Sequence, residues 1–232
     1  LVESAHVALV ELVKNSYDAD ATVVKVRLSP RSFGAPETEV SDNGSGMTFD
    51  DVRKYWMRIA TTNKRENETS AIYGRRRTGS KGIGRFSCRR LGRRLKLITT
   101  AAIGGGKFER TEVSFNWAEF EPGTEISTIQ CKGNRSVVSE GPTGTTLVIS
   151  GSLVDEWGKR GYDFLKRQLT VLVANRGARR PGFKKDPGFN VSLEAPGFNE
   201  NIKDLRERLL AAGWGQLTIQ VKSNGEAVCE LA

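Results

Sequence analysis

The sequence predicts an α/β protein, a two-layer α/β sandwich in which helices cover one face of a mixed sheet. Three observations predict it. Apolar residues recur at helical spacing near the start of the chain and then alternate as they do in strands. A helix, two strands, a second helix and a long loop are expected before a run of strands. The composition is that of a globular domain, with 38% hydrophobic and 27% charged residues. This order of elements is typical of helices packed on one side of a sheet.

The chain begins with the pattern of an amphipathic helix. Apolar residues between positions 2 and 18 recur every three to four residues, which predicts a helix with one buried face. Residues 22–28 alternate and are rich in valine, so they predict a strand, and residues 38–41 predict a second, short one. Thr48 and Asp51 have the spacing of a capping box, so a helix is expected to begin there.

A long segment without periodicity, residues 61–84, separates these elements from the rest. It is rich in polar, basic and glycine residues, which predicts a loop, and loops of this length are usually functional or disordered. The elements expected after it are a short helix at 87–91, strands at 94–101, 108–117, 125–132 and 145–150, helices at 162–175 and 199–212, and hairpin strands at 217–221 and 227–231.

The net charge of +9 is concentrated in one stretch. Between Glu68 and Glu109 there are eleven Lys or Arg residues and no acidic residue, so the rest of the chain has a net charge of −2. An evenly basic surface would suggest nonspecific binding to nucleic acid. A local excess around glycines instead favours a local polyanion, either a nucleoside triphosphate or a nucleic-acid backbone beside it.

Cysteine usage and hydropathy limit the other classes. No apolar run approaches the ~20 residues that span a bilayer, and no signal peptide is recognisable. Cys88, Cys131 and Cys229 have neither zinc-site nor disulfide spacing, so free thiols in a reducing cytoplasm are expected. The chain opens without methionine and inside a helical pattern, which predicts a fragment of a longer protein.

Three polar segments contain the candidate chemistry, and the first lies on the N-terminal helix. Glu11, Asn15 and Asp18 are spaced i, i+4 and i+7, so they share one stripe of the helix. A solvated polar face would give the same pattern. The functional interpretation is a carboxylate that takes a proton from water, beside an amide oxygen suited to a hard cation such as Mg²⁺.

The other two segments are rich in glycine. Residues 42–47, Asp-Asn-Gly-Ser-Gly-Met, follow a predicted strand and could form an ordinary turn. In the functional interpretation, the glycines let a ligand approach closely and Asp42 accepts a hydrogen bond from an exocyclic amine. Residues 79–85, Gly-Ser-Lys-Gly-Ile-Gly-Arg, precede a predicted helix, and their N–H groups could bind an anion. Their spacing is neither that of a Walker loop nor that of a Rossmann fingerprint.

Together and in this order, these segments resemble the motifs of the GHKL ATPases, the family of gyrase, heat-shock chaperones, histidine kinases and MutL-type mismatch-repair proteins. The resemblance implies a Bergerat-type ATP-binding fold over roughly residues 1–175. Residues 176–232 are expected to extend that domain or to begin a following one. The matching motifs are ELVKNSYDADAT at 11–22, DNGSGM at 42–47, TGSKGIGRFS at 78–87 and Gly-Thr-Thr at 144–146.

The resemblance also implies a role for each matched residue. Glu11 would be the general base for the attacking water, and Asn15 would coordinate Mg²⁺ through its amide oxygen. Asp42 would accept a hydrogen bond from the adenine amine, supported by Thr145. The other residues implied to contact ATP are Gly44, Gly46 and Met47 along the base, Lys81, Gly82, Ile83 and Gly84 at the phosphates, and Asp18, which could instead stabilise the helix end or the neighbouring loop.

Two features depart from the family pattern. Many members contact the γ-phosphate with a lysine from a following domain, and residues 61–64 are the one candidate substitute in this chain. The predicted lid also contains Arg75, Arg76 and Arg77, which could serve the ATP phosphates, a second subunit or an external polyanion.

Three functions remain open at this level. The leading one is a Mg²⁺-dependent ATPase that works as a switch, in which ATP orders the lid and promotes a homodimer, and hydrolysis resets both. The second is a histidine-kinase catalytic domain, although the single histidine, His6, lies within the nucleotide helix, a poor position for a phosphoacceptor. The third is a non-hydrolysing module that binds ATP or, through the basic lid, nucleic acid. No membrane partner is expected.

Overall fold

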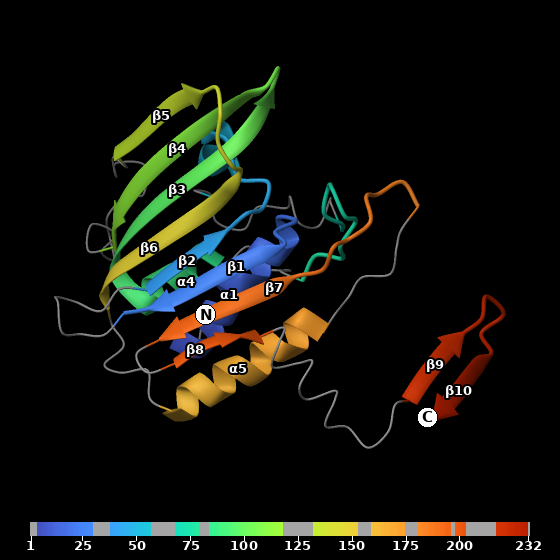
Figure 1. Ribbon diagram of the computed structural model, residues 1–232. Helices are drawn as coiled ribbons and strands as arrows, with labels where there is room; N and C mark the ends of the chain where they lie inside the picture. The colour runs from blue at the N-terminus through green and yellow to red at the C-terminus, as the bar shows by residue number, and fades with distance from the viewer. Residues whose placement is uncertain are drawn as a thin grey trace.

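A computed structural model describes residues 4–29, 38–56, 68–78, 84–117, 132–152, 159–174, 181–195, 198–202 and 217–231. Within these ranges the chain forms two layers, an eight-stranded sheet and helices packed on one of its faces (Figure 1). The predicted fold class is therefore confirmed. The longer helices are α1 (Ala5–Asp18), α4 (Gly84–Leu91) and α5 (Lys159–Ala174).

The sheet is mixed, with the strand order β5-β4-β3-β6-β2-β1-β7-β8. Strands β1 and β7 pair in parallel, and every other neighbouring pair in this sheet is antiparallel. The strands are β1 (Val23–Leu28), β2 (Thr38–Asp42), β3 (Gly92–Gly104), β4 (Lys107–Asn116), β5 (Lys132–Val138), β6 (Gly144–Ser152), β7 (Asn190–Ala195) and β8 (Phe198–Asn201).

The core lies between the sheet and the helices. The helical spacing of apolar residues in α1 buries Leu9 and Val13 completely, and the alternation in β1 buries Val24 and Val26 while the residues between them face outward. On α5, Leu165 and its neighbours one and two turns on are buried in the same cluster. The apolar face of α1 is therefore fixed between the sheet and two other helices, so its polar stripe has a defined position.

The helix expected after Thr48 forms, although it is short. Thr48 and Asp51 make both bonds of the predicted capping box at the start of α2 (Phe49–Asp51). A π-helical turn, η2 (Val52–Trp56), continues it and buries Val52. Of the expected loop at 61–84, residues 68–78 form turns around an isolated bridge between Thr69 and Arg76, and α4 begins at Gly84.

Two expectations differ from the structure at the sheet edges. A helix was expected over 199–212, but residues 198–201 form strand β8. Because β8 pairs with β7, it gives hydrogen-bond partners to a strand that would otherwise lie at the edge of the sheet. Residues 203–212 lie outside the described ranges. A strand was expected at 125–132, but β5 begins only at Lys132, and residues 125–131 also lie outside those ranges.

The C-terminal hairpin forms as expected, from β9 (Leu217–Val221) and β10 (Ala227–Leu231). It is a separate two-stranded sheet, and its side chains at 219–230 are all exposed. No helix in the described part of the chain is long and apolar enough to cross a membrane.

Candidate functional site

Asp42 ends β2 on the helix-covered side of the sheet, where three hydrogen bonds from different segments hold its carboxylate. The Gly44 and Thr145 N–H groups donate to Oδ1 at 2.9 and 3.2 Å, and the Ser16 hydroxyl donates to Oδ2 at 2.8 Å. A carboxylate offers about four acceptor positions, so the described residues leave one position open on Oδ2. Burial raises the pKa of Asp42, and these three bonds act in the opposite direction.

Helix α1 brings the first predicted segment to this carboxylate. Ser16, which bonds Asp42, directly follows Asn15, so the polar stripe of α1 is fastened to the end of β2. Glu11 lies about one helical turn before Asn15 on the same stripe, and its side chain is 24% exposed. Its Oε1 atom is 2.7 Å from Lys14 Nζ. Glu11 and Asn15 are both half-buried.

The loop after Asp42 runs so close to other backbone that it requires glycine. Gly46 has a φ of 68°, and a Cβ there would lie 2.6 Å from the carbonyl carbon of Thr100 and would overlap its oxygen. A Cβ at Gly44 would lie 2.7 Å from the carbonyl oxygen of Ala19. The Met47 N–H donates to the Thr99 hydroxyl at 2.9 Å, so the loop is fixed to β3 as well as to β2.

Thr145 lies beside Asp42 because β2 and β6 pair in that register. Its support for the carboxylate comes from its backbone N–H, while its hydroxyl is 3.1 Å from the Thr99 hydroxyl. Ser16 and Thr99 are site residues that the sequence analysis did not single out. A signal existed for Ser16, since it lies between Asn15 and Asp18 and a buried aspartate needs donors.

Asp18 and Asp20 face the segment 68–78 at the end of α1. Asp18 is buried, and its Oδ1 accepts bonds from the Thr78 N–H at 2.8 Å and the Thr78 hydroxyl at 3.1 Å. Asp20 has a φ of 62° and accepts bonds from the N–H groups of Ile72, at 2.7 Å, and Tyr73, at 3.2 Å. Asp18 is therefore hydrogen-bonded to the neighbouring loop, a contact that its expected alternative role in stabilising that loop requires.

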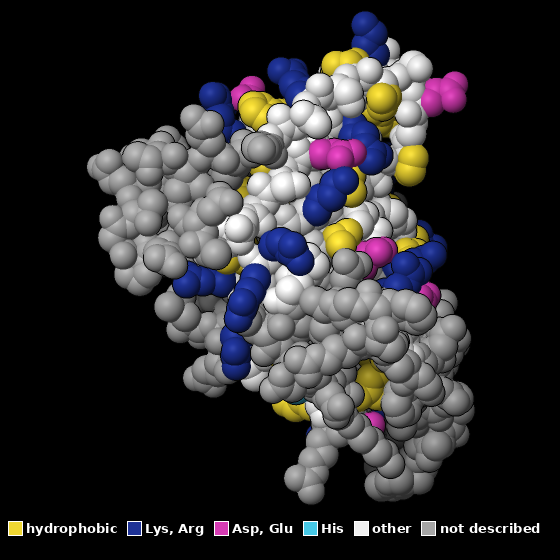
Figure 2. Space-filling model, turned by 90° about the vertical axis from the view of Figure 1, so that its left-hand side faces the viewer, with side chains coloured by type: hydrophobic (Ala, Val, Ile, Leu, Met, Phe, Trp, Pro, Cys, Tyr) yellow, Lys and Arg dark blue, Asp and Glu magenta, His cyan; other side chains and the backbone are white. Residues whose placement is uncertain are grey.

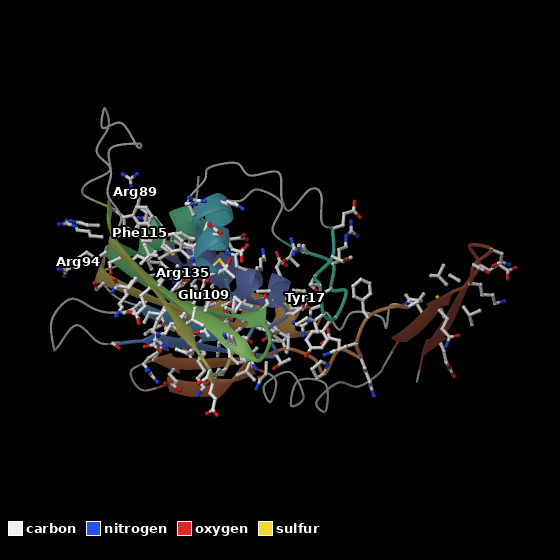
Figure 3. All side chains as sticks on the ribbon, turned by 90° about the horizontal axis from the view of Figure 1, so that it is seen from above. Tyr17, Arg89, Arg94, Glu109, Phe115 and Arg135 are labelled. Carbon is white, nitrogen blue, oxygen red and sulfur yellow. The ribbon has the colours of Figure 1, made fainter. Side chains whose placement is uncertain are left out.

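Arg75 belongs to this segment, and its side chain is buried. It is therefore unavailable to the ATP phosphates, to a second subunit or to an external polyanion. Its guanidinium makes two parallel bonds to Asp186, at 2.8 and 2.7 Å, and lies over the Tyr17 ring, 4.7 Å from its centroid. Burial alone would raise the pKa of Asp186, but the Arg75 bond, the Gly188 N–H and the Arg75 charge outweigh it and lower that pKa. Figure 3 labels Tyr17. The neighbouring Arg76 is exposed.

Several predicted site residues lie outside the described ranges, namely Lys81, Gly82 and Ile83 and the candidate segment 61–64. Gly84 is the first residue of α4, which packs against α1. No group of three or more His, Cys, Asp or Glu side chains in the described part of the chain could hold a metal ion.

Residues 2–138 match the family model described as histidine kinase-, DNA gyrase B-, and HSP90-like ATPase. The chain belongs to this family. The resemblance to GHKL ATPases is thereby confirmed, and the Asp42 site is built from the segments on which that resemblance rests.

Two curated relatives match shorter stretches of this ATPase-family chain. It is 39% identical over 74 residues to the "Putative type II restriction enzyme HgiDII" of Herpetosiphon aurantiacus, a match covering 32% of this chain and 11% of that protein. It is 37% identical over 62 residues to the DNA mismatch repair protein MutL of Methanocorpusculum labreanum, covering 27% of this chain and 10% of that protein. The matches thus span about a tenth of each relative.

The fold is similar to that of the ATPase region of Saccharomyces cerevisiae topoisomerase II. The structure of that region bound to ICRF-187 (dexrazoxane) has a TM-score of 0.53, and a second structure of it has one of 0.52. In both cases the identity is 14%, and the match covers 93% of this chain and 54% of that chain. At this identity the likeness shows the fold alone.

Proposed function

We propose that this domain binds ATP with Mg²⁺, hydrolyses it, and uses the cycle to close and open a lid and a homodimer. One observation carries the proposal. The Asp42 carboxylate keeps an acceptor position open, and Ser16 fastens it to the helix on which Glu11 and Asn15 share a stripe. Helix α1 therefore connects Asp42, which suits adenine, with Asn15, which suits the metal, and Glu11, which suits the attacking water.

Adenine recognition is assigned to Asp42 and the loop that follows it. The open position on Oδ2 suits a donor such as the exocyclic amine of adenine. Gly44 and Gly46 have no Cβ, which lets the loop pack tightly against backbone without covering the carboxylate. Met47 is half-buried against the core and offers an apolar surface along the base.

Asn15 is the proposed protein ligand of Mg²⁺. Mg²⁺ usually keeps several waters and takes only one or two protein oxygens together with substrate phosphates. The single amide oxygen of Asn15, without an acidic cluster among the described residues, is consistent with this mode of Mg²⁺ coordination. When bound, the ion would neutralise charge on the phosphates. The N–H groups around Lys81, Gly82, Ile83 and Gly84 would bind the phosphates at the start of α4.

Glu11 is the proposed general base. Its carboxylate would take a proton from water as the water oxygen attacks the γ-phosphorus, and the bond to the β-phosphate oxygen would break to release ADP and phosphate. Glu11 is partly exposed, so water can reach it, and α1 holds it in place. Lys14, three residues later on the helix, donates to Oε1 of Glu11, so Oε2 of Glu11 remains for accepting the proton.

Lid closure is the proposed readout of bound ATP. Thr78 is bonded to Asp18, directly before the glycine-rich segment, so the described part of the lid is attached to the nucleotide helix. Without phosphates, the cations of the lid other than Arg75, such as Arg76, Arg77 and Lys81, repel one another. Limited proteolysis should cut the lid readily without nucleotide and slowly with a nonhydrolysable analogue. Equal cleavage in both states would contradict the switch.

The surroundings of His6 argue against this residue as the phosphoacceptor of a histidine kinase. Its ring packs edge-on against Phe164, with centroids 6.0 Å apart, and leaves no space for a Cβ at Gly161. Burial also lowers the pKa of His6. A histidine packed between α1 and α5 is poorly placed to accept a phosphoryl group from another site.

Replacing the proposed base tests hydrolysis directly. In the full-length protein, Glu11→Gln should keep ATP affinity within about twofold and lose on the order of 10²-fold or more in turnover, the usual contribution of a general base. Glu39→Gln is the matched control, because Glu39 lies on the other face of β2 and pairs with Arg27 at 3.6 Å. Unchanged turnover in Glu11→Gln would refute the base. ATP binding by a wild-type protein without turnover would establish the non-hydrolysing alternative.

The boundaries and surroundings of the domain are also proposals. We propose that residues 1–175 form the ATPase domain and that residues 176–232 extend it or begin a following domain. The pairing of β7 with β1 supports an extension for that strand. A reducing cytoplasm is proposed from the free cysteines, of which Cys88 is buried and Cys229 exposed. Nucleic acid remains a proposed partner of the basic segment, and the arginines concerned are identified below.

A further inference from the structure

We propose that four arginines at the junction of α4 and β3 bind the phosphate backbone of a nucleic acid. Arg89, Arg90, Arg93 and Arg94, here called the arginine corner, are all exposed. They lie on the rigid body of the domain, outside the lid, and they are the largest run of exposed arginines in the described part of the basic segment. The inference goes beyond the ATPase proposal and does not depend on hydrolysis.

The arginine corner is fixed in place by the residues inside it. Leu91 is 1% exposed, and Gly92 follows it directly, so α4 passes into β3 without a linker. A Cβ at Gly92 would lie 2.7 Å from both the Ile149 side chain and the Ser150 carbonyl oxygen, so the two segments pack tightly there. The arginines therefore extend from a preorganised base, which reduces the entropy lost when a ligand orders them.

No acidic side chain among the described residues pairs with the corner, whereas three other exposed cations of β3, β4 and β5 are paired. Arg135 forms an ion pair with Glu109 at 2.6 Å, and Figure 3 labels both residues. Lys96 and Arg110 share Glu112, at 3.1 and 2.9 Å. Within the described ranges the four arginines thus have no acidic partner, which suits them to an external anion.

Among the described residues, the two sheet partners of Arg94 are polar and uncharged. In the sheet, Arg94 lies opposite Asn116 on one side and Ser150 on the other. Figure 2, which shows the side of the molecule where β3 begins, displays a run of Lys and Arg side chains with no Asp or Glu between them. In Figure 3, Arg89 and Arg94 extend outward at the same end of the molecule.

These properties favour a nucleic-acid backbone over an acidic protein. Protein interfaces have an apolar centre, while nucleic-acid interfaces are polar and strongly positive. None of the exposed large apolar side chains in the described ranges lies in the corner; Ile103, on the same strand, is at the opposite end of β3. Guanidinium groups bind phosphate oxygens in a bidentate manner, and hydroxyl and amide side chains nearby can add bonds to the backbone.

A helix-stabilising role can account for at most two of the four arginines. Arg89 and Arg90 are in the last turn of α4, where a cation stabilises a helix by about 0.3–1 kcal/mol. Arg93 and Arg94 lie beyond the helix and have no such role. A surface that binds phosphates accounts for all four.

The test compares two double variants of the full-length protein with a control of equal charge. The variants are Arg89→Gln/Arg90→Gln and Arg93→Gln/Arg94→Gln, and the control is Lys25→Gln/Lys107→Gln, two exposed lysines on β1 and β4. Binding of a fluorescein-labelled DNA duplex and of a labelled single strand is measured by anisotropy over a series of salt concentrations. ATP binding and thermal unfolding are measured in parallel.

Each corner variant should weaken nucleic-acid binding by about tenfold or more. It should reduce the salt slope by about 1.8 for the duplex or about 1.4 for the single strand, the values for two lost phosphate contacts. The control should change affinity less than about twofold, and ATP binding should be unaffected in all variants. Equal losses in the control and the corner variants would overturn the proposal. Competition by polyglutamate as effective as that by DNA would overturn it in favour of an acidic protein. The duplex and single-strand arms show which form of the backbone binds.

Discussion

The close approach of Gly46 to β3 predicts that alanine at this position is more damaging than its backbone angle alone would make it. Gly46 has a φ of 68° and Gly106, in the β3–β4 turn, has one of 70°. Alanine in this left-handed region costs about 1–2 kcal/mol at either position. At Gly106 nothing lies within 4 Å of the new Cβ, whereas at Gly46 the Cβ would lie 2.6 Å from the carbonyl carbon of Thr100. Because that neighbour is backbone in a central strand, it cannot move aside easily.

The overlap should add about 1–3 kcal/mol, as overpacking does in a protein interior. We therefore expect Gly106→Ala to lower the free energy of unfolding by about 1–2 kcal/mol and Gly46→Ala by about 2–5 kcal/mol. Urea unfolding of this chain measures both. ATP affinity, measured by calorimetry, should fall at least about tenfold in Gly46→Ala alone, since about 1.4 kcal/mol of distortion in the binding loop is enough. Equal stability losses in the two variants, with ATP affinity retained, would refute the reasoning.

Three further predictions concern titratable groups. Asp42→Asn should weaken ATP binding about tenfold or more because the side chain loses one acceptor oxygen. Since burial raises the pKa of Asp42 above 3.8, wild-type affinity should fall as pH drops through that raised value; pH-independent affinity in calorimetry would count against adenine recognition by the carboxylate. The pKa of Asp186 is lowered below 3.8, so its stabilising contribution is complete above pH 3.8 and is lost as pH falls through the lowered value. Asp186→Asn, which leaves Arg75 without its anion, should cost about 3–5 kcal/mol at neutral pH and flatten the acid part of the stability curve, as fluorescence-monitored unfolding would show. Burial raises the pKa of Cys88 to about 12, so iodoacetamide at neutral pH should label the exposed Cys229 and leave Cys88 unmodified; rapid labelling of Cys88, detected by mass spectrometry, would mean that α4 opens readily.

Local patterns were enough to predict most of the fold. The spacing of apolar residues in α1 and the alternation in β1 record which face each element buries, so periodicity predicted both. The capping box of Thr48 and Asp51 is a local interaction and was predictable for the same reason. Strand β8 was not, because residues 198–201 become a strand only through pairing with β7, which their own sequence does not encode.

The site shows the same division between local and distant information. The sequence indicated Asp42 and its glycines by residue type and order, but not the donors that hold the carboxylate. Ser16 is 26 residues away from Asp42 and Thr145 is 103 residues away, and only the sheet brings them together. The three consecutive arginines at 75–77 were expected to serve the ATP phosphates, a second subunit or an external polyanion. Arg75 is buried instead, because its carboxylate partner lies 111 residues later. Charge patterns show how many cations a segment has, but not which of them the fold encloses.

The separation of Arg75 and Asp186 in the sequence has a consequence for how the protein folds during synthesis. Arg75 and β1 leave the ribosome long before Asp186 and β7, which complete their surroundings 111 or more residues later. At typical translation rates of roughly 5–20 residues per second, the delay is on the order of ten seconds. During that time one edge of β1 lacks its parallel neighbour and a guanidinium destined for the interior lacks its anion. A nascent chain in this state offers an unpaired strand edge to other chains, so the interval before β7 is synthesised is when chaperones would protect this domain most.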